Sequence, residues 1–234
     1  MTAERRVVLI TGAAGHLGRA VAAHFAEAGE RRVLVDVNAQ ALREAFGESG
    51  DDQLLAAADL LQPGGAEGAV RQALERFGRI DVLCNLAGGF GMGPAVHELS
   101  DADWDHLFDL NARTVLHAVR AVVPHMLERG SGKVVNVGAY SALRGVAQMG
   151  AYTASKGVVM RLTEALAGEL RARGINVNCV LPSIIDTPDN RRAMPDADPA
   201  QWVAPGDLAQ VIGFLASDAA RAVHGACVPV TGLV

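Results

Sequence analysis

Cysteine and paired metal ligands are scarce in this chain of 234 residues. It has only three cysteines, Cys84, Cys179 and Cys227, which are far apart in the sequence and each lie in an apolar run. No CxxC motif is present, and none of the seven histidines has a partner at metal-binding spacing within a helix or turn. We therefore expect reduced core cysteines, as is typical of cytoplasmic proteins, with neither a disulfide framework nor a metal site.

Long hydrophobic runs and clusters of basic residues are also missing. No apolar run is long enough to span a membrane, and the first strand begins too near the N-terminus to leave room for a signal peptide. The net charge is -5, without a Lys/Arg-rich run, which argues against a nucleic-acid partner. We expect a cytoplasmic protein whose partner is a small-molecule substrate, not a membrane or nucleic acid.

Aromatic residues make up only 4% of the chain, whereas half of it is hydrophobic and 26 residues are glycine. This composition is typical of a layered α/β protein, and the length suits one domain. Short β-branched runs alternate with amphipathic stretches, which predicts a doubly wound, seven-stranded parallel sheet of the Rossmann type in a three-layer α/β/α fold. The predicted strands are 5–11, 31–36, 53–59, 80–87, 133–138, 175–182 and 226–230, and the predicted helices are 16–29, 38–48, 65–77, 101–129, 150–173 and 205–217.

One segment departs from this alternation. Residues 183–205 are rich in proline and aspartate and have weak periodicity. They follow the carboxyl end of a predicted strand, where ligands bind in sheets of this type. We expect a single domain over residues 1–234 in which 183–205 forms a lid over the site.

The stretch TGAAGHLG, from Thr11 to Gly18, joins the first strand to the first helix. Gly12, Gly15 and Gly18 permit a tight turn, close approach of a pyrophosphate and close packing of helix on strand. The helix N-terminus adds free N–H groups and a positive dipole end. This context favours a dinucleotide site over a plain glycine-rich turn.

Carboxylates and small residues follow the next strands. Asp36 ends the second strand, where a carboxylate accepts hydrogen bonds from ribose hydroxyls and repels a 2′-phosphate, so NAD(H) is favoured over NADP(H). A cap for the following helix is the alternative role of Asp36. Asp59 ends the third strand and is a candidate residue to face the edge of the cofactor's adenine ring. The small residues of Asn85–Gly89 leave room for a flat cofactor at the end of the fourth strand.

The motif AYTASK places Tyr152 and Lys156 four residues apart at the start of a helical stretch, on one face. A nearby ammonium favours the phenolate and lowers the tyrosine pKa, so that the phenol passes a proton near neutral pH. Such a pair is common by chance, but here it follows a dinucleotide fold and a strand end of small residues.

Together TGAAGHLG, NLAGG, the stretch DLNART with Asn111, and YTASK resemble the short-chain dehydrogenase/reductase family over essentially the whole chain. The resemblance implies a nicotinamide cofactor and hydride transfer, with Tyr152 as proton donor and Lys156 as the ligand of the nicotinamide ribose. It also implies that Asn111 holds a relay water, with a polar kink in the long helix as the alternative. The cofactor-binding residues that it implies are Gly12, Gly15, His16, Leu17, Gly18, Asp36, Asp59, Leu60, Asn85, Ala87, Gly88, Tyr152, Lys156, Pro182, Ile185 and Thr187.

Two residues depart from the family pattern. His16 stands where the family has glycine, with Gly15 one place earlier. The family's serine before the tyrosine is Ala139 here, which cannot donate a hydrogen bond to a substrate carbonyl. The loss of one such donor commonly costs about 3–4 kcal/mol of transition-state stabilisation. Ser141 is a candidate replacement, because residues two apart on an extended strand share a face; bonding of the loop backbone is its alternative. Tyr140 is predicted to point away from Ala139 and to pack against the rest of the protein.

A narrower resemblance concerns the same stretch. The segments CNLAGGFGMG, VGAYSALRG and LPSIIDTPDNRRAMPDADPAQW are similar to the quinonoid dihydropteridine reductase branch, which also has alanine at this position. It implies NADH as donor and a quinonoid acceptor that needs little polarisation. In the lid, Thr187 is implied to bond the nicotinamide carboxamide, with an ordinary turn hydroxyl as the alternative. Met194 and Trp202 are predicted as apolar walls or lid packing, and Arg191 and Arg192 as solvated charges.

The main hypothesis is an NADH-dependent oxidoreductase that passes a hydride to a planar quinonoid or carbonyl acceptor while Tyr152 supplies the proton. One alternative is a ketoreductase or alcohol dehydrogenase that uses Ser141 or water in place of the missing serine. Another is a non-catalytic NAD-binding regulator. Apolar residues on more than one face of the predicted helices 101–129 and 150–173 indicate a homodimer or homotetramer.

Overall fold

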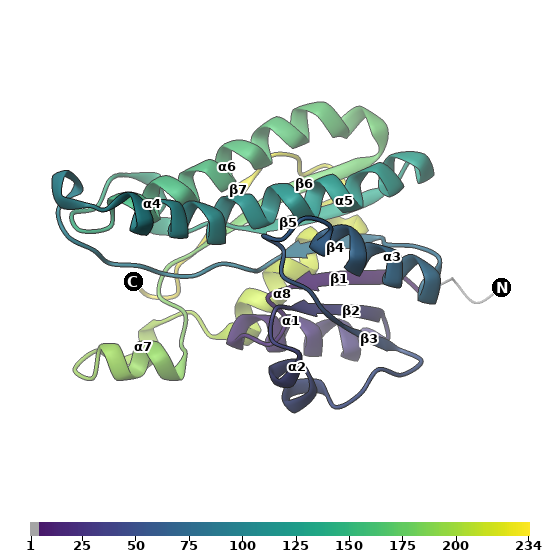
Figure 1. Ribbon diagram of the computed structural model, residues 1–234, viewed down its shortest axis with the longest axis horizontal. Coiled ribbons are helices and arrows are strands. Elements are labelled where there is room, and N and C mark those ends of the chain that lie inside the picture. Colours follow the sequence, from purple (N-terminus) through teal and green to yellow (C-terminus); the bar gives the residue numbers. More distant parts are fainter. Residues whose placement is uncertain (1–4) are drawn as a thin grey trace.

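A computed structural model describes residues 5–234, and its centre is the predicted seven-stranded sheet (Figure 1). The strand order is β3-β2-β1-β4-β5-β6-β7, and every neighbouring pair is parallel. The direction of winding reverses between β1 and β4, the point where sheets of this type bind ligands. The strands are β1 Val7–Thr11, β2 Arg31–Asp36, β3 Gln53–Ala57, β4 Val82–Asn85, β5 Gly132–Val137, β6 Ile175–Pro182 and β7 Cys227–Val230.

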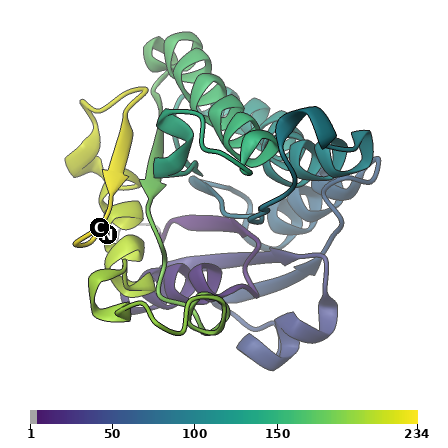
Figure 2. The same ribbon diagram turned by 90° about the vertical axis from the view of Figure 1, so that its left-hand side faces the viewer.

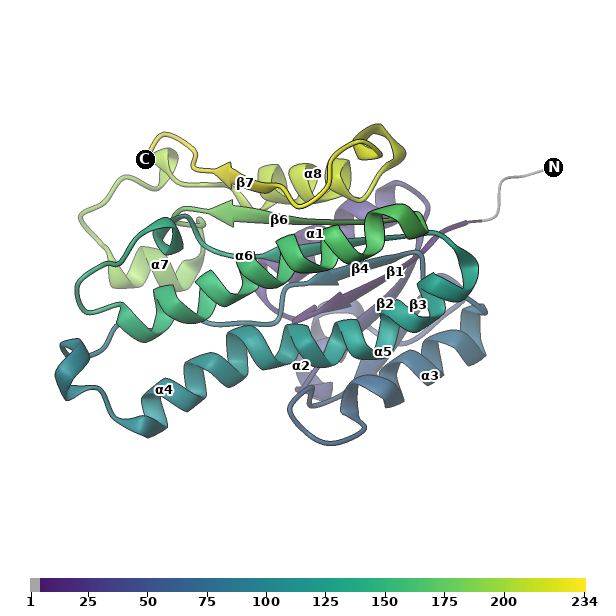
Figure 3. The same cartoon turned by 90° about the horizontal axis from the view of Figure 1, so that it is seen from above.

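Helices cover both faces of the sheet, so the predicted three-layer fold is confirmed (Figure 3). Alternate residues of β1 enter the two apolar clusters, with Leu9 on one face and Ile10 on the other. One face carries α3 (Gly65–Phe77), α5 (Thr114–Arg129) and α6 (Gly150–Leu170), and the other carries α1 (His16–Glu27), α2 (Ala39–Phe46) and α8 (Pro205–Leu215).

Several residues that suggested a subunit contact belong instead to this core. Val115, Val119, Val122 and Val159 are buried in the cluster that joins α5 and α6 to the sheet. They cover the sheet and leave no surplus apolar face at those positions. The homo-oligomer therefore stays a prediction with less support than the sequence pattern indicated.

The predicted helix 101–129 is one continuous rod with a distorted middle. α4 (Asp101–Phe108) passes into a π-helical stretch, Asp109–Arg113, and then into α5. A π-helical turn carries one extra residue, and such turns are frequent at functional sites. Asn111 lies in this stretch, so the predicted kink and the predicted site role occur at the same residue.

The carboxyl ends of the strands meet at one edge of the sheet, the side that Figure 2 turns toward the viewer. Thr11 Oγ1 accepts the N–H groups of Leu86 and Ala87, both at 3.1 Å, and so fastens the end of β1 to the end of β4. The predicted lid lies at this edge. It contains a short helix, α7 (Pro188–Ala193), and its two ends are joined by a parallel bridge between Ile185 and Val203.

The cysteines are free thiols, but two of them are neighbours in space. Cys179 and Cys227 face each other across β6 and β7. Contact with Cys227, together with burial, keeps the pKa of Cys179 well above its ordinary range. Sequence distance concealed this pair, because parallel strand pairing joins segments that are remote along the chain.

Within residues 5–234, no helix combines the length and apolarity needed to cross a bilayer. The same residues contain no group of three or more His, Cys, Asp or Glu side chains arranged to hold a metal ion.

Candidate active site

The glycine turn after β1 forms a cradle without room for side chains. Gly12 has a φ of +64°, and a Cβ there would lie 2.8 Å from the amide nitrogen of Ala87. A Cβ on Gly18 would lie 2.3 Å from the carbonyl oxygen of Gly12. α1 begins at His16 without a side-chain cap, which leaves its first N–H groups to a ligand. These residues fit the pyrophosphate of a dinucleotide.

Gly18→Ala is expected to weaken NADH binding by at least about tenfold. Its Cβ would overlap the carbonyl oxygens of Gly12 and Ala13, at 2.3 and 2.5 Å, so the turn must change shape. Gly68→Ala, on α3 and outside the cradle, is the matched control, because a Cβ there meets only Arg71 Nη2, at 3.8 Å. Isothermal titration measures both affinities, and equal losses would contradict a cradle that Gly18 shapes.

Asp36 lies at the end of β2, beside the glycine turn. Its Oδ2 accepts the N–H of Ala14 at 3.1 Å, and its Oδ1 accepts the N–H of Asn38 at 3.2 Å. The capping alternative for Asp36 is wrong, because Asn38 caps α2 by accepting the N–H of Ala41 at 3.0 Å. The half-buried carboxylate is therefore held next to the turn and not within the helix end.

Other predicted cofactor residues make structural contacts. Asp59 Oδ1 accepts the N–H of Leu61 at 2.9 Å, and the carbonyl oxygen of Leu60 contacts His117 Nδ1 at 2.6 Å. Asn85 turns its side chain into the sheet, where its Nδ2 donates to Asn136 Oδ1 at 2.8 Å. Their roles toward a cofactor stay predictions, as do those of the half-buried Leu17 and the buried Pro182.

The structure brings Asn111 and Lys156 together beside Gly88. A Cβ on Gly88 would lie 2.8 Å from Asn111 Oδ1 and 3.1 Å from Lys156 Nζ. Asn111 Oδ1 accepts the N–H of Gly89 at 2.9 Å, and Lys156 Nζ donates to the carbonyl oxygen of Val137 at 3.0 Å. Both side chains are buried, so their positions are tightly determined.

Ser155 is a positioning residue that the sequence analysis missed. Its hydroxyl accepts a hydrogen bond from Asn111 Nδ2 at 3.1 Å and donates to the carbonyl oxygen of Tyr152 at 2.9 Å. It is fully buried and links the π-helical stretch to α6. The available signal was its place inside YTASK, between the two residues already selected.

The predicted lowering of the Tyr152 pKa is wrong for the protein alone. Burial raises the pKa of Tyr152 to about 12. Burial also lowers the pKa of Lys156 to about 8, an effect that the neighbouring Cys179 opposes. Because Lys156 donates to Val137 and not to the phenol, desolvation outweighs its charge. At neutral pH the phenol is therefore protonated, as a proton donor must be.

The segment that follows β5 is not the extended strand that was predicted for Ala139 and Ser141. β5 ends at Val137, and Tyr140–Leu143 forms a 3₁₀-helical turn after the buried Ala139. The strand argument for Ser141 is therefore wrong, because residues 139 and 141 do not share one strand. Tyr140 does not pack either, since its side chain is 43% exposed. The half-buried Ser141 hydroxyl makes no hydrogen bond within residues 5–234.

The lid is held by a helix cap and by ion pairs. Thr187 caps α7 by accepting the N–H of Asn190 at 3.2 Å. Arg191 contacts Asp186 at 2.6 and 2.7 Å, and Arg192 contacts Asp189, so both exposed arginines are paired within the lid.

His16, the departure in the glycine turn, lies against the lid. Its Nε2 is 3.7 Å from Asp189 Oδ2, on the first turn of α7. The residue that replaces a family glycine thus connects the cradle to the lid.

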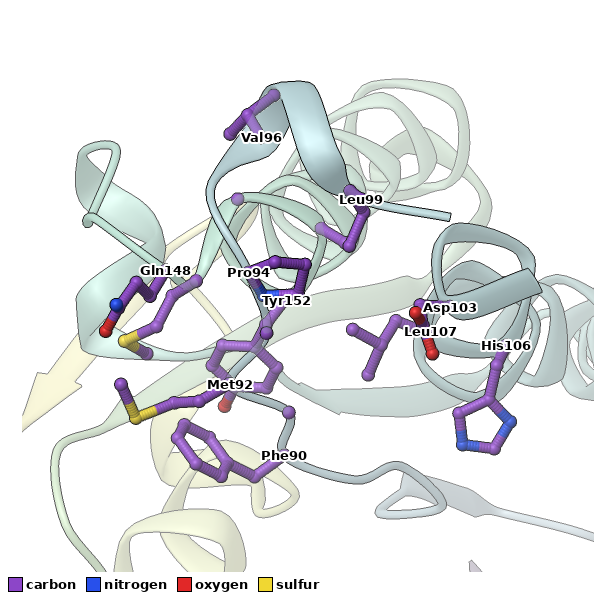
Figure 4. A pocket seen from close by; sticks show the side chains of 15 residues that line it. Phe90, Met92, Pro94, Val96, Leu99, Asp103, His106, Leu107, Gln148 and Tyr152 are labelled. Carbon is purple, nitrogen blue, oxygen red and sulfur yellow. The ribbon is translucent and has the colours of Figure 1, made fainter. Parts of the chain in front are cut away.

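A cavity of about 250 Å³ opens beside Tyr152 (Figure 4). Seven of its fifteen lining residues come from residues 90–99, and α4, the first turn of α6 and the two residues before α6 complete it. Met194 and Trp202 do not line it, which favours lid packing for both, and Trp202 is buried. These walls were not predicted from the sequence, although FGMGPAV follows the end of β4 after a gap of four residues, at a strand end of the kind that binds ligands.

Comparisons with known proteins agree with this arrangement. The family described as short chain dehydrogenase matches residues 6–198. The (2S)-[(R)-hydroxy(phenyl)methyl]succinyl-CoA dehydrogenase subunit BbsD of Thauera aromatica is 36% identical, over 99% of this chain and 97% of that protein. Levodione reductase of Leifsonia aquatica is 34% identical, over 97% of this chain and 93% of that protein.

A solved structure has the same fold throughout. The 3-ketoacyl-(acyl-carrier-protein) reductase from Brucella melitensis, complexed with NADH, is similar with a TM-score of 0.87 and 31% identity, covering 98% of each chain. The narrower resemblance to the quinonoid dihydropteridine reductases stays a prediction.

Proposed function

Because this chain belongs to the short-chain dehydrogenase/reductase family, we propose that it transfers a hydride from NADH to a planar quinonoid or carbonyl acceptor, with Tyr152 as the proton donor. The observation that carries the proposal is the pair of buried side chains Lys156 and Asn111 beside Gly88, with the half-buried Tyr152 one helical turn before Lys156, at the edge that also holds the glycine cradle. A protein that only binds NAD needs no such cluster, which argues against a regulator.

The residues of this edge would hold the cofactor in a defined way. Gly12, Gly18 and the N-terminus of α1 would bind the pyrophosphate, and Asp36 would bind the ribose hydroxyls. Lys156 would bind the nicotinamide ribose, and the Thr187 hydroxyl would bond the carboxamide. NADH supplies the hydride when bound, and the side chains of this chain supply orientation and the proton.

Tyr152 and its neighbours would handle the proton. With a pKa raised to about 12, the phenol is protonated at neutral pH and would give its proton to the acceptor oxygen or nitrogen. The Lys156 ammonium would stabilise the phenolate that remains. Asn111, fixed by Gly89 and Ser155, would hold the water that returns a proton to Tyr152.

Ala139 restricts the acceptor. Its methyl group offers no hydrogen bond to a developing oxyanion, so an acceptor with an unactivated carbonyl would react slowly. A quinonoid ring or an activated carbonyl needs less polarisation. The names of the relatives range from a substituted succinyl-CoA to levodione, and they leave the acceptor open.

Steady-state oxidation of NADH tests the proposal. The assay uses a quinonoid dihydropterin, an aryl α-diketone and a panel of simple ketones as acceptors. Turnover of the quinonoid or α-diketone compounds, with weak turnover of simple ketones, is expected. NADH binding without turnover of any acceptor would instead support a regulator.

Ser141 supports a second candidate, a ketoreductase that uses this hydroxyl as the missing donor. The observation in its favour is that the hydroxyl is half-buried and unbonded among the described residues. Ser141→Ala would then abolish reduction of simple ketones and leave NADH affinity unchanged. An unchanged rate in this variant excludes the candidate.

Ala139→Ser is expected to raise kcat/KM for simple ketones by about 10²-fold, because it restores one oxyanion donor. The kcat/KM for the quinonoid acceptor should change by less than about threefold, because this acceptor needs little polarisation. Ala142→Ser, on the adjacent 3₁₀ turn, serves as the control for adding a hydroxyl nearby. A rate for ketones that does not rise would show that the missing hydroxyl is not limiting.

Asp36 is expected to make NADH at least about 50-fold better than NADPH in kcat/KM, because a 2′-phosphate would lie against the carboxylate. Asp36→Asn keeps the size of the side chain and an acceptor for one N–H but removes the charge. The ratio of kcat/KM for NADH to that for NADPH should therefore fall to about tenfold or less. Initial rates with both cofactors measure it. Equal use of the two cofactors by the wild-type protein contradicts the role of Asp36.

A further inference from the structure

The cavity beside Tyr152 has walls of distinct chemistry. Loop residues Phe90 and Met92 and the α4 residue Leu107 give it an apolar middle. Figure 4 places Asp103 and His106 together on one side of this middle and Gln148 on the other. Its volume, about 250 Å³, is below the range of about 300–1,000 Å³ that is usual for drug-sized ligands. The occupant is therefore a small molecule or a small group.

The described lining of the cavity includes an acidic side chain but no lysine or arginine. Among the described residues that line it, none is lysine or arginine, and the ionisable ones are Asp103, His106 and Tyr152. The Asp103 carboxylate accepts a hydrogen bond from Ser100 Oγ at 2.6 Å, which holds it at the rim. A carboxylate on the occupant would find no lysine or arginine on the walls and would be repelled by Asp103. Asp103 is exposed, so this repulsion acts through solvent and is strongest at low ionic strength.

Phe90 gives the apolar middle a preference for rings. Its ring meets that of Tyr152 edge to face, with centroids 5.0 Å apart and planes at 71°. The ring is still 63% exposed, so one of its faces is open to a ligand. Gly89 and Gly91 flank it, and a Cβ there would lie 2.7 Å from Leu110 Cδ2 and 3.1 Å from Leu107 Cδ1, respectively. The backbone is thus held close to the α4 rod, and Phe90 is directed over the reactive tyrosine.

From these contacts we propose that the substrate places an uncharged ring in this cavity, that Phe90 selects for the ring, and that Asp103 rejects the same ring when it carries a carboxylate. The inference rests on the proposed function for its acceptor chemistry, but it concerns binding and is tested by binding.

A matched pair of ligands tests the charge rule. Methyl 4-acetylbenzoate and 4-acetylbenzoate share a ring and a ketone and differ by one negative charge. Isothermal titration of the NAD⁺-loaded protein measures both affinities without turnover, because the oxidised cofactor has no hydride to give. The neutral ester is expected to bind at least about tenfold more tightly than the carboxylate.

Variants assign the effect to residues. Asp103→Asn should reduce the preference for the ester to about threefold or less, whereas Asp101→Asn, on the same helix but outside the cavity, should leave it unchanged. Phe90→Ala should lower the affinity for the ester by about fivefold, and Phe90→Tyr should bind the ester as tightly as the wild-type protein does. Thermal melts of each variant confirm that folding is intact.

The outcomes separate this inference from the proposed function. Equal affinities for the ester and the carboxylate, or binding of neither, overturn the inference even when NADH oxidation is observed with other acceptors. Preferential binding of the ester supports the inference even when no acceptor is reduced, a result that would overturn only the proposed function. A charge preference that survives in Asp103→Asn overturns the role of Asp103.

Discussion

Tyr152→Phe is expected to lower kcat/KM for acceptor reduction by about 10²–10⁴-fold, because it removes the proton donor and nothing else. The ring stays, and with it the edge-to-face contact with Phe90. The glycine cradle and Lys156 are unchanged, so NADH loses at most one contact with the Tyr152 hydroxyl, and its dissociation constant should rise by less than about tenfold. Stopped-flow or steady-state rates with the best acceptor measure the loss, and fluorescence titration measures the affinity.

Tyr140→Phe is the matched control for this experiment, because Tyr140 is the other tyrosine of the chain and its side chain is exposed. Its rate should equal that of the wild-type protein. If Tyr152→Phe retains activity within about tenfold, the proton comes from elsewhere, with water or Ser141 as the first alternatives.

The pKa of Tyr152 adds a prediction on pH. Burial raises this pKa to about 12, so the phenol keeps its proton throughout the neutral and mildly alkaline range. In the reductive direction, deprotonation of free-enzyme Tyr152 should therefore cause no decline in kcat/KM below about pH 11. A decline centred near pH 8 would point instead to Lys156.

Lys156→Met is expected to abolish most activity and yet stabilise the fold. Burial lowers the pKa of Lys156 from 10.5 to about 8, a difference that corresponds to about 3 kcal/mol of unfavourable free energy for the buried ammonium. The lost hydrogen bond to Val137 offsets about 1–2 kcal/mol of this. The net gain of about 1–2 kcal/mol should raise Tm by about 2–8 °C.

The dependence of this gain on pH follows from proton binding. Below about pH 8 the lysine is charged in both the folded and unfolded states, and the wild-type protein bears the full penalty. Between about pH 8 and 10.5 only the unfolded state keeps the proton, so the wild-type free energy of unfolding rises with pH. The advantage of Lys156→Met should therefore shrink across this interval, as urea unfolding at several pH values would reveal.

Lys133→Met provides the contrast, because Lys133 is the other lysine of the chain. Lys133 lies on β5, away from the cavity. Its Nζ donates to Asn176 Oδ1 at 2.9 Å and lies 3.4 Å from Asp218 Oδ1. This variant should lose stability and keep activity, the opposite of Lys156→Met. Destabilisation in both variants would contradict a penalty for the buried Lys156 ammonium.

Much of the fold and part of the site were predictable from local sequence. The apolar strands, the glycine turn and the Tyr152/Lys156 spacing are short-range patterns, and each matches one position at the carboxyl edge of a parallel sheet. Asn111 was also found, because its motif stands in the helix that follows β4. The bounds of several elements shifted by a few residues, since strand and helix ends depend on pairing and capping partners elsewhere in the chain.

Local patterns were thus enough to predict a parallel α/β fold, a turn suited to a pyrophosphate and a tyrosine and lysine on one helical face. Four properties emerge only from the folded chain: the direction of the Tyr152 pKa shift, the 3₁₀ turn that removes Ser141 from the strand, the pairing of Cys179 with Cys227 and the walls beside Phe90. These properties depend on which remote segments pack together and on how far they exclude water. Periodicity and spacing along the chain carry no record of either, because burial and long-range contacts arise only when the chain has folded.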